Sequence, residues 1–267
     1  MVRSARLPTI SRLGRDLLET RSSQRWRTLA RPFGLLGLYA VAYRMGWWFA
    51  TPAIVFLVFV AIVTSAHDVV HGSLGLGRRG TEWALFALGA VLLASGHSYR
   101  TSHLQHHRVF PGPDDPEGDP ARMTFWGAVR HGPSFLPRLW YWAWKRSCGR
   151  ERRWLLAEAL WAALVLFAGI ALWPATHAVL VYAAMVHSGA WVFPLLTVHL
   201  PHRDYGETPL TQTHTLRGRI VPALFLELTY HLEHHLYPQV PSHNLAKLSR
   251  RLDPVFREAG VVPWRVP

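Results

Sequence analysis

The chain has 267 residues, enough for one large domain, and half of its residues are apolar. Its 29 Lys and Arg stand against 16 Asp and Glu, which gives a net charge of +13. Long uncharged apolar runs between basic segments are typical of a membrane protein with charged flanks, and they argue against a nucleic-acid-binding protein. The one cysteine, Cys148, excludes an intramolecular disulfide and a cysteine-ligated cluster, so redox chemistry would draw its electrons from outside the chain.

Two apolar runs follow a basic N-terminal segment. Residues 1–32 carry eight arginines, and we expect them to form an arm on the cytosolic membrane surface, attracted to anionic lipid. Residues 33–50 are about long enough for one membrane crossing, since a span needs about 20 residues. Residues 52–66 return at once, and the helix that they predict continues through His67 to His71.

A shorter apolar run, residues 81–96, lies between the first two groups of histidines. If it crossed the membrane, those groups would be separated by a hydrocarbon core about 30 Å thick. A metal centre shared by both groups therefore requires a re-entrant or interfacial helix here, although length alone also allows an ordinary crossing. Residues 108–153 are polar and basic; they contain a turn-rich loop, 111–120, and a tryptophan- and arginine-rich part typical of interfacial amphipathic structure.

A second pair of apolar runs, residues 154–172 and 176–198, is joined by a tight turn and followed by a polar loop. We therefore predict an all-α integral membrane protein with about four transmembrane helices, a re-entrant or interfacial helix and a histidine-rich cap on the cytosolic side. The predicted divisions are the arm, 1–32, a membrane catalytic domain, 33–250, and a polar C-terminal tail, 251–267.

The distribution of charge predicts the orientation. With the amino terminus inside, four crossings place residues 1–32, 67–153 and 199–267 on one side, with 28 of the 29 Lys and Arg; only Arg44 lies elsewhere. An excess of Lys and Arg marks the cytoplasmic side of a membrane protein. The sequence thus predicts a multi-pass protein of the cytoplasmic (inner) membrane whose histidine groups, and therefore its active site, face the cytosol.

Eight of the 16 histidines fall in three groups at the ends of apolar runs. His67 and His71 are four residues apart, and the other two groups share the spacing HxxHH, in 103–107 and in 231–235. Offsets of 0, 3 and 4 place side chains on one face of a helix. One such group would equally suit a polar helix face, but three indicate metal binding. Eight imidazoles exceed the ligands that one ion accepts, so the pattern predicts two metals, and nitrogen ligands suit Fe, Cu, Ni or Zn.

These motifs resemble those of the membrane fatty acid desaturase superfamily, which includes acyl-lipid and acyl-CoA desaturases, carotenoid ketolases and hydroxylases. The matching stretches are HDxxH at 67–71, HxxHH at 103–107 and YHLEHHLYPxVP at 230–241, and the resemblance covers about residues 60–250. It implies a desaturase-like domain with a non-haem di-iron centre, held by histidines at the cytosolic membrane face, that uses O2 and two external electrons. The metal centre itself would carry the chemistry, so no separate catalytic side chain is predicted.

The superfamily usually adds one more ligand before the last motif, and here His199 and His202 are the candidates. His202 is preferred because Leu-Pro-His-Arg at 200–203 resembles the same stretch of carotenoid ketolases. The Asn that many desaturases carry one turn earlier is missing, since this region has Val198. The predicted metal ligands are therefore His67, His71, His103, His106, His107, His202, His231, His234 and His235.

Carboxylates are the usual partners of the outward ring N–H groups of metal-bound histidines. The acidic loop after the second group either folds back for this purpose or forms a solvated turn; its members are Asp114, Asp115, Glu117 and Asp119. Asp68 and Glu233 have offsets that point away from the metals, whereas Glu227 is expected near the ligands. His97 lies outside the ligand spacing, and His187 is either a core residue or faces the substrate.

The leading interpretation is an O2-dependent di-iron oxidoreductase that introduces a double bond into a fatty acyl chain. The near alternative is a carotenoid ketolase or hydroxylase with the same fold and metals. The Leu-Pro-His-Arg stretch and the missing Asn favour the alternative, whereas Val-Pro-Ser-His-Asn-Leu at 240–245 resembles acyl desaturases. A zinc protease would place its Glu differently, as in HExxH, and a non-enzymatic metal transporter would carry its ligands midway along its crossings.

The predicted cofactors are two Fe ions, with O2 as co-substrate. The predicted partners are a lipid substrate, the membrane and an external electron donor such as a ferredoxin, without nucleic acid. An acidic donor would dock on the basic face of the protein. Attraction of the same face to anionic lipid is the alternative explanation of its charge.

Overall fold

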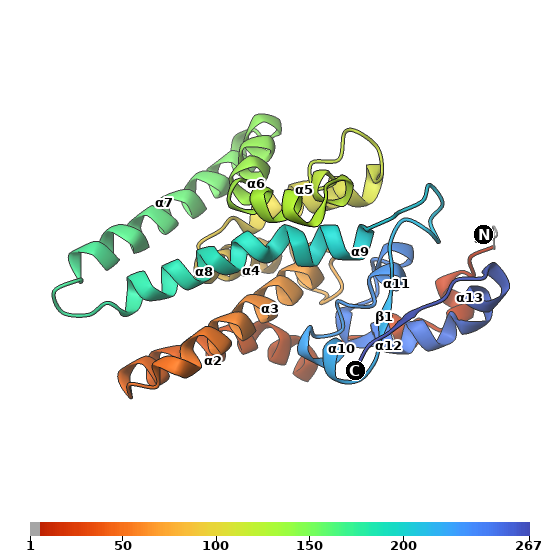
Figure 1. The fold of residues 1–267 in the computed structure, drawn as a ribbon, viewed down its shortest axis with the longest axis horizontal. Coiled ribbons are helices and arrows are strands. Elements are labelled where there is room, and N and C mark those ends of the chain that lie inside the picture. Colours follow the sequence, from red (N-terminus) through yellow and green to blue (C-terminus); the bar gives the residue numbers. More distant parts are fainter. Residues whose placement is uncertain (1–5) are drawn as a thin grey trace.

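Helices make up most of the described chain, residues 6–267, in the computed structural model (Figure 1). The first five residues of the predicted arm lie outside the described range. The predicted helical class is confirmed, and two short strands, β1 (Leu216–Arg217) and β2 (Trp264–Arg265), pair in parallel. In chain order the helices are α1 (Ile10–Leu13), η1 (Arg15–Leu18), α2 (Ser22–Arg44), η2 (Trp48–Ala50), α3 (Thr51–Val70), α4 (Arg78–Leu92), α5 (Gly96–Val109), η3 (Asp119–Arg122), α6 (Phe125–Arg146), α7 (Gly149–Ala171), α8 (Ala178–Pro194), the π-helix η4 (Leu195–His199), α9 (Leu200–His202), α10 (Ile220–Leu224), α11 (His231–Leu236), α12 (Ser242–Arg251) and α13 (Asp253–Ala259).

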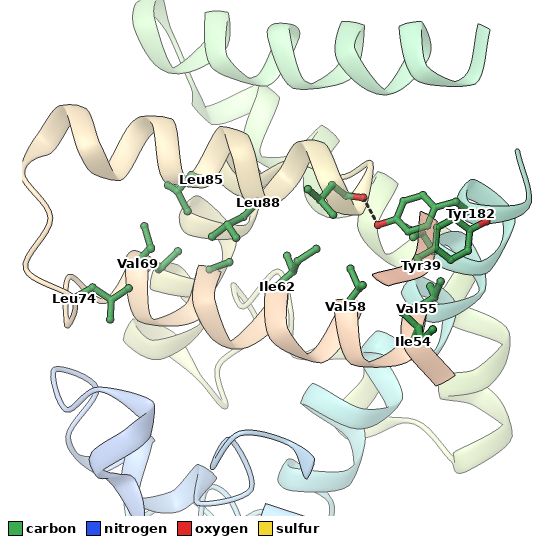
Figure 2. Close-up of a cluster of buried hydrophobic side chains, with 14 of the residues drawn as sticks. Tyr39, Ile54, Val55, Val58, Ile62, Val69, Leu74, Leu85, Leu88 and Tyr182 are labelled. Carbon is green, nitrogen blue, oxygen red and sulfur yellow. Dashed lines mark hydrogen bonds between the residues drawn. The ribbon is translucent and has the colours of Figure 1, made fainter. Parts of the chain in front are cut away.

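Helices α2 and α3 form a hairpin that turns at Gly46, whose φ of 74° favours glycine. Helix α3 lies at the centre of the bundle, against α2, α4 and α8, and is buried on every face from Val58 to Val70. From Ala53 to Val63 it is apolar all round, which suits a helix surrounded by other helices. Figure 2 shows its core side chains facing Leu88 of α4, and Tyr182 of α8 donates a hydrogen bond to the carbonyl oxygen of Val91 (2.9 Å) that fastens α4 to α8.

Three helical segments of the described chain are long and apolar enough to cross a membrane: Trp48–Val70, Gly149–Ala171 and Ala178–His202. They contain α3, α7 and α8, in agreement with three of the four predicted crossings. Helix α2 is as long, and it contains most of the predicted crossing 33–50. It is not among the three segments because its first half carries several arginines, which lower its hydropathy. A fourth crossing through α2 therefore stays a prediction.

The predicted re-entrant segment corresponds to α4 and the turn after it. With 15 residues, α4 is only about 22 Å long at 1.5 Å per residue, shorter than the hydrocarbon core of about 30 Å. The chain reverses at Leu93, in the left-handed region with φ 51°, and enters α5 at Gly96. Helix α5 then returns to the end of α3, where the rings of His71 and His103 lie 5.2 Å apart between centroids. The first two histidine groups therefore lie on the same side of the bundle.

A cap at one end of the bundle contains α11, α12 and α13 together with the N-terminal helices α1 and η1 (Figure 1). Leu13 and Leu17 pack in one buried cluster with Leu245 and Leu248 of α12. Residues 10–18 of the predicted arm are therefore attached to the cap. Contact of the arm with a membrane surface stays a prediction.

The close approach of α5 to α4 depends on Gly96. A Cβ atom at this position would lie 2.4 Å from the carbonyl oxygen of Leu85, a backbone atom that cannot rotate away. We expect Gly96→Ala to lower the free energy of unfolding by about 1–3 kcal/mol, as overpacking does. Gly37→Ala is the matched control, since nothing lies within 4 Å of its added Cβ atom, and it should leave stability unchanged or raise it. Thermal unfolding in detergent measures both, and equal stability of the two variants would contradict this account.

Asp16 attaches the N-terminal helices to α12. Its carboxylate pairs with Arg251 (2.8 Å) and also with Lys247. The hydrogen bond from Arg251 has the larger effect and that from Lys247 the next; together they hold the pKa of Asp16 well below its usual range. A lowered pKa in the folded state stabilises the attachment above the unfolded pKa of about 4, and this contribution is lost as the pH falls. Asp16→Asn should therefore speed cleavage of residues 6–20 by a protease at neutral pH, and the difference in rate between variant and parent should shrink as the pH is lowered.

Candidate metal centre

Nine histidines from four parts of the chain meet between the bundle and the cap. They come from the end of α3, from α5, from α9 and from α11. One group brings its ring nitrogens within 4.8 Å of one another and consists of His67, His71, His103 and His234. A second group does the same and consists of His106, His202 and His235. These seven residues all belong to the nine predicted ligands.

The remaining two predicted ligands, His107 and His231, complete the groups. The Nε2 atom of His107 lies 2.9 Å from that of His234 and 3.2 Å from that of His103. The Nε2 atom of His231 lies 3.0 Å from that of His202. The rings of His107 and His235 are 4.4 Å apart between centroids, so the two groups are neighbours. The structure thus brings together every predicted ligand, five in the first group and four in the second.

The contacts inside the cluster suit metal ions better than hydrogen bonds. The Nε2 atom of His234 lies 2.9 Å from the Nε2 atoms of both His67 and His107. A neutral imidazole has one N–H and one lone pair, so at most some of these converging nitrogens can pair with one another. The pKa values of His103 and His235 lie well below 6.5, mainly because the rings are buried and secondly because other imidazoles lie beside them. The rings therefore present lone pairs without charge, which is the form that binds first-row transition metals.

Carboxylates and carbonyls fix the outer side of several rings. His106 Nδ1 lies 2.7 Å from Asp115 Oδ2, and His103 Nδ1 lies 3.1 Å from Glu117 Oε2. His202 Nδ1 donates to the carbonyl oxygen of Gln212 (3.0 Å). An acceptor at Nδ1 holds the proton there and turns the Nε2 lone pair towards the cluster, the arrangement typical of metal-bound histidines.

The acidic loop therefore divides into two kinds of residue. Asp115 and Glu117 are buried and fold back onto the histidines. Asp119 pairs with Arg138 at the surface (3.4 Å), and Asp114 is exposed. Asp115 and Glu117 thus fold back onto the histidines, whereas Asp114 and Asp119 belong to a solvated turn, so each prediction holds for part of the loop. Burial raises the pKa of Glu117 to about 7. The hydroxyl of Ser102 donates a hydrogen bond to the Glu117 carboxylate.

The acidic residues inside the motifs have their hydrogen-bond partners outside the cluster, in line with the prediction, although Asp68 Oδ1 also lies 3.8 Å from the outer nitrogen, Nδ1, of His67. Asp68 accepts hydrogen bonds from the backbone N–H (2.9 Å) and the hydroxyl (2.7 Å) of Ser242, the first residue of α12. Glu233 pairs with Arg217 (3.4 Å). Within the described chain, Glu227 has no hydrogen bond to a histidine of the cluster, so its expected place near the ligands finds no support.

Two further histidines are buried but lie outside both groups. His199 Nδ1 donates to the carbonyl oxygen of Pro120 (2.9 Å), so the geometry favours His202 over His199. His97 lies between two carboxylates, with Nδ1 2.8 Å from Glu158 and Nε2 3.3 Å from Glu82. Sequence reasoning did not find this arrangement. The available signal was a lone glutamate in each of two apolar runs.

A cavity of about 630 Å³ adjoins the histidine cluster. Residues of α3, of the α4–α5 turn, of α6, α7 and α8 line it, and most of them are apolar. Tyr99 forms part of its wall and stacks on the ring of His103, with 4.8 Å between centroids. Ala66, the neighbour of His67, lines it as well. An apolar molecule in the cavity would therefore contact Tyr99, whose ring separates it from His103.

Fold and site define a helical protein with apolar helices of membrane-spanning length and a buried histidine cluster able to hold metal ions. Residues 45–267 match the family model described as fatty acid desaturase. The chain is also 29% identical over 196 residues to a beta-carotene ketolase of Paracoccus sp. (strain N81106 / MBIC 01143), and 30% identical to that of Paracoccus sp. (strain PC1). Each match covers 68% of this chain and 71% of the relative. The protein belongs to the fatty acid desaturase family.

Asp115 gives a direct test of the metal-binding role of the cluster. Asp115→Asn keeps an oxygen near His106 Nδ1 but removes the charge that makes this imidazole a stronger ligand. We expect metal affinity to fall by about 10–100-fold, the usual effect of losing such a partner. Competition with a chelator measures it on the purified protein. Asp114→Asn, one residue away and exposed, is the control; equal loss in both variants would contradict the role of Asp115.

Proposed function

We propose that the protein is a membrane-bound, O2-dependent oxidoreductase that oxidises an unactivated C–H bond of a lipid at two iron ions. The observation that carries this proposal is an apolar cavity whose wall includes Tyr99, a side chain that stacks on His103 in the cluster of nine converging histidines. The proposed iron ligands are His67, His71, His103, His106, His107, His202, His231, His234 and His235.

The residues of this chain would hold, orient and seclude the reactants. Bound iron would supply, from O2 and two electrons of an external donor, the strong oxidant that protein side chains lack. The histidines provide neutral nitrogen ligands, and Asp115 and Glu117 hold two of their rings in place. The apolar cavity wall excludes water and places a carbon chain or ring beside the cluster.

The relatives favour a carotenoid ring as the substrate. Both curated relatives are named beta-carotene ketolases, and the stretch 200–203 resembles the same enzymes. Formation of a ring ketone would consume O2, two external electrons and two protons in each of two oxygen insertions at one carbon. One water would form each time, and the resulting gem-diol would lose a final water. We therefore place a carotenoid first, in reverse of the order that the sequence alone favoured.

A fatty acyl chain is the second candidate, favoured by the description of the matching family and by the stretch 240–245. Here two hydrogens leave adjacent carbons, and O2 with two external electrons and two protons becomes two waters. The fold and the metals are the same for both substrates. Only the product separates them.

The proposed location is the cytoplasmic membrane, with the histidine cluster on the cytosolic side. The support is the charge distribution, since 28 of the 29 Lys and Arg lie in the segments that this orientation places inside. The same basic face would dock an acidic electron donor such as a ferredoxin.

Expression in a host that makes both β-carotene and membrane lipids tests the proposed function. A red shift of the pigment supports the ketolase, and new acyl double bonds support the desaturase. We expect His106→Ala or His234→Ala to abolish the product without preventing membrane insertion, while the exposed His177→Ala retains it. The purified parent should hold about two irons per chain. Zinc alone, or substantial product from either ligand variant, would refute the proposal.

A further inference from the structure

The cavity beside the histidines has its mouth on the side of the bundle. Six of its lining residues are exposed there, from α6, α7 and α8: Pro133, Pro137, Ala159, His187, Ser188 and Trp191. Helices α7 and α8 contain two of the three segments able to span a membrane. Ala159 and His187 each lie nine or ten residues from the first residue of their helix, about 14 Å along the axis. The part of the mouth formed by α7 and α8 therefore lies at the depth of the hydrocarbon core, and α6, predicted to be interfacial, forms its other side.

The walls of the cavity carry no side chain that would bind a phosphate. Within the described chain its lining contains no Lys or Arg, and its one acidic residue is Glu158. The Glu158 carboxylate already accepts from the backbone N–H of Gly96 (3.1 Å) and faces His97 Nδ1 (2.8 Å). A substrate joined to coenzyme A or to a carrier protein brings phosphate groups, which arginine and lysine usually recognise.

The polar residues at the mouth are bonded within their own helix. His187 Nδ1 donates to the carbonyl oxygen of Ala183 (2.8 Å), and the hydroxyl of Ser188 donates to that of Ala184 (2.9 Å). Each of these polar side chains therefore has a hydrogen-bond partner within its helix, which lowers the cost of placing it next to lipid. The lining of the mouth thus suits a hydrocarbon molecule, and the exposed Arg138 beside Pro137 already pairs with Asp119 (3.4 Å).

Trp191 holds one side of the mouth in place. Pro133 has no N–H, so the carbonyl oxygen of Val129, four residues earlier, lacks its usual partner in α6. The indole N–H of Trp191 donates to this carbonyl across the helix pair. Its ring also packs on Gly132, where an added Cβ atom would lie 2.1 Å from the indole. The mouth is therefore a preformed feature that α6 and α8 build together.

We propose that the substrate enters sideways from the bilayer, through the mouth between α6, α7 and α8, as a lipid dissolved in the membrane and free of any soluble carrier. This inference rests on the proposed function for the chemistry at the inner end of the cavity. It adds the route of entry and restricts the substrate class to membrane-dissolved lipids. Lateral entry of a free lipid excludes the alternative route, in which an ester of coenzyme A or of a carrier protein enters from the cytosol.

Photolabelling tests the route without turnover. The full-length protein is reconstituted in phosphatidylcholine vesicles that contain a phosphatidylcholine with a diazirine near the end of one acyl chain, and labelled residues are mapped by mass spectrometry. We expect labels on buried cavity residues such as Val186 and Phe193, which lipids around the bundle do not reach. A soluble acyl-coenzyme A should not compete.

Substitutions at the mouth make the test specific. Ala162→Trp fills the cavity between α7 and α8, and Ser188→Trp obstructs it from the other helix, so each should lower cavity labelling at least about tenfold. Leu164→Trp, on the exposed face of α7 and outside the cavity lining, should leave labelling unchanged. Metal content of each variant checks that the cluster is intact.

The outcomes separate this inference from the proposed function. Loss of cavity labels in both mouth variants, with the control unchanged, supports lateral entry even if no pigment or acyl product is ever formed. Unchanged labelling in Ala162→Trp and Ser188→Trp, or displacement of the label by acyl-coenzyme A, overturns lateral entry even if the protein is a lipid oxidase.

Discussion

Nine imidazoles whose nitrogens face one another are the constraint on which this structure depends. Several Nε2 atoms lie about 3 Å apart, and burial holds the pKa of His234 well below 6.5, so its ring offers an uncharged lone pair to a shared partner. No single segment can build it. Helix α3 ends at the cluster, α5 returns to it after the short α4, and α9 and α11 approach it from the opposite half of the chain.

A second layer of contacts holds these elements in register. Asp68 lies in the first motif, yet it binds the start of α12, immediately after the third motif. Asp115 and Glu117 attach the acidic loop to α5. Glu158 of α7 accepts hydrogen bonds from the first residues of α5 and so fixes where that helix begins. The positions of these elements thus depend on contacts between residues far apart in the sequence.

The cluster and the cavity lie on two sides of the same wall. Polar contacts gather on the side of the cap, and apolar residues line the side of α7 and α8. Tyr99 belongs to both, since it stacks on His103 and lines the cavity. This separation is compatible with the proposed function, because a lipid could remain in apolar surroundings on one side of the wall while the histidines lie on the other. Proline in the interior of α6 and the indole of Trp191 keep the mouth of the cavity in place.

The sequence by itself determined the helical class, the apolar segments and the histidine sets, because helix periodicity is local and fixes which side chains share a face. It also indicated that residues 81–96 return without crossing. Tertiary structure alone decided which carboxylates reach the rings, and it placed His202 rather than His199 in the cluster after a π-helical turn that shifts the helical register. The paired carboxylates around His97 and the direction of the cavity were decided in the same way. Each depends on contacts between residues distant in the chain, and such contacts leave no periodic signal in the sequence.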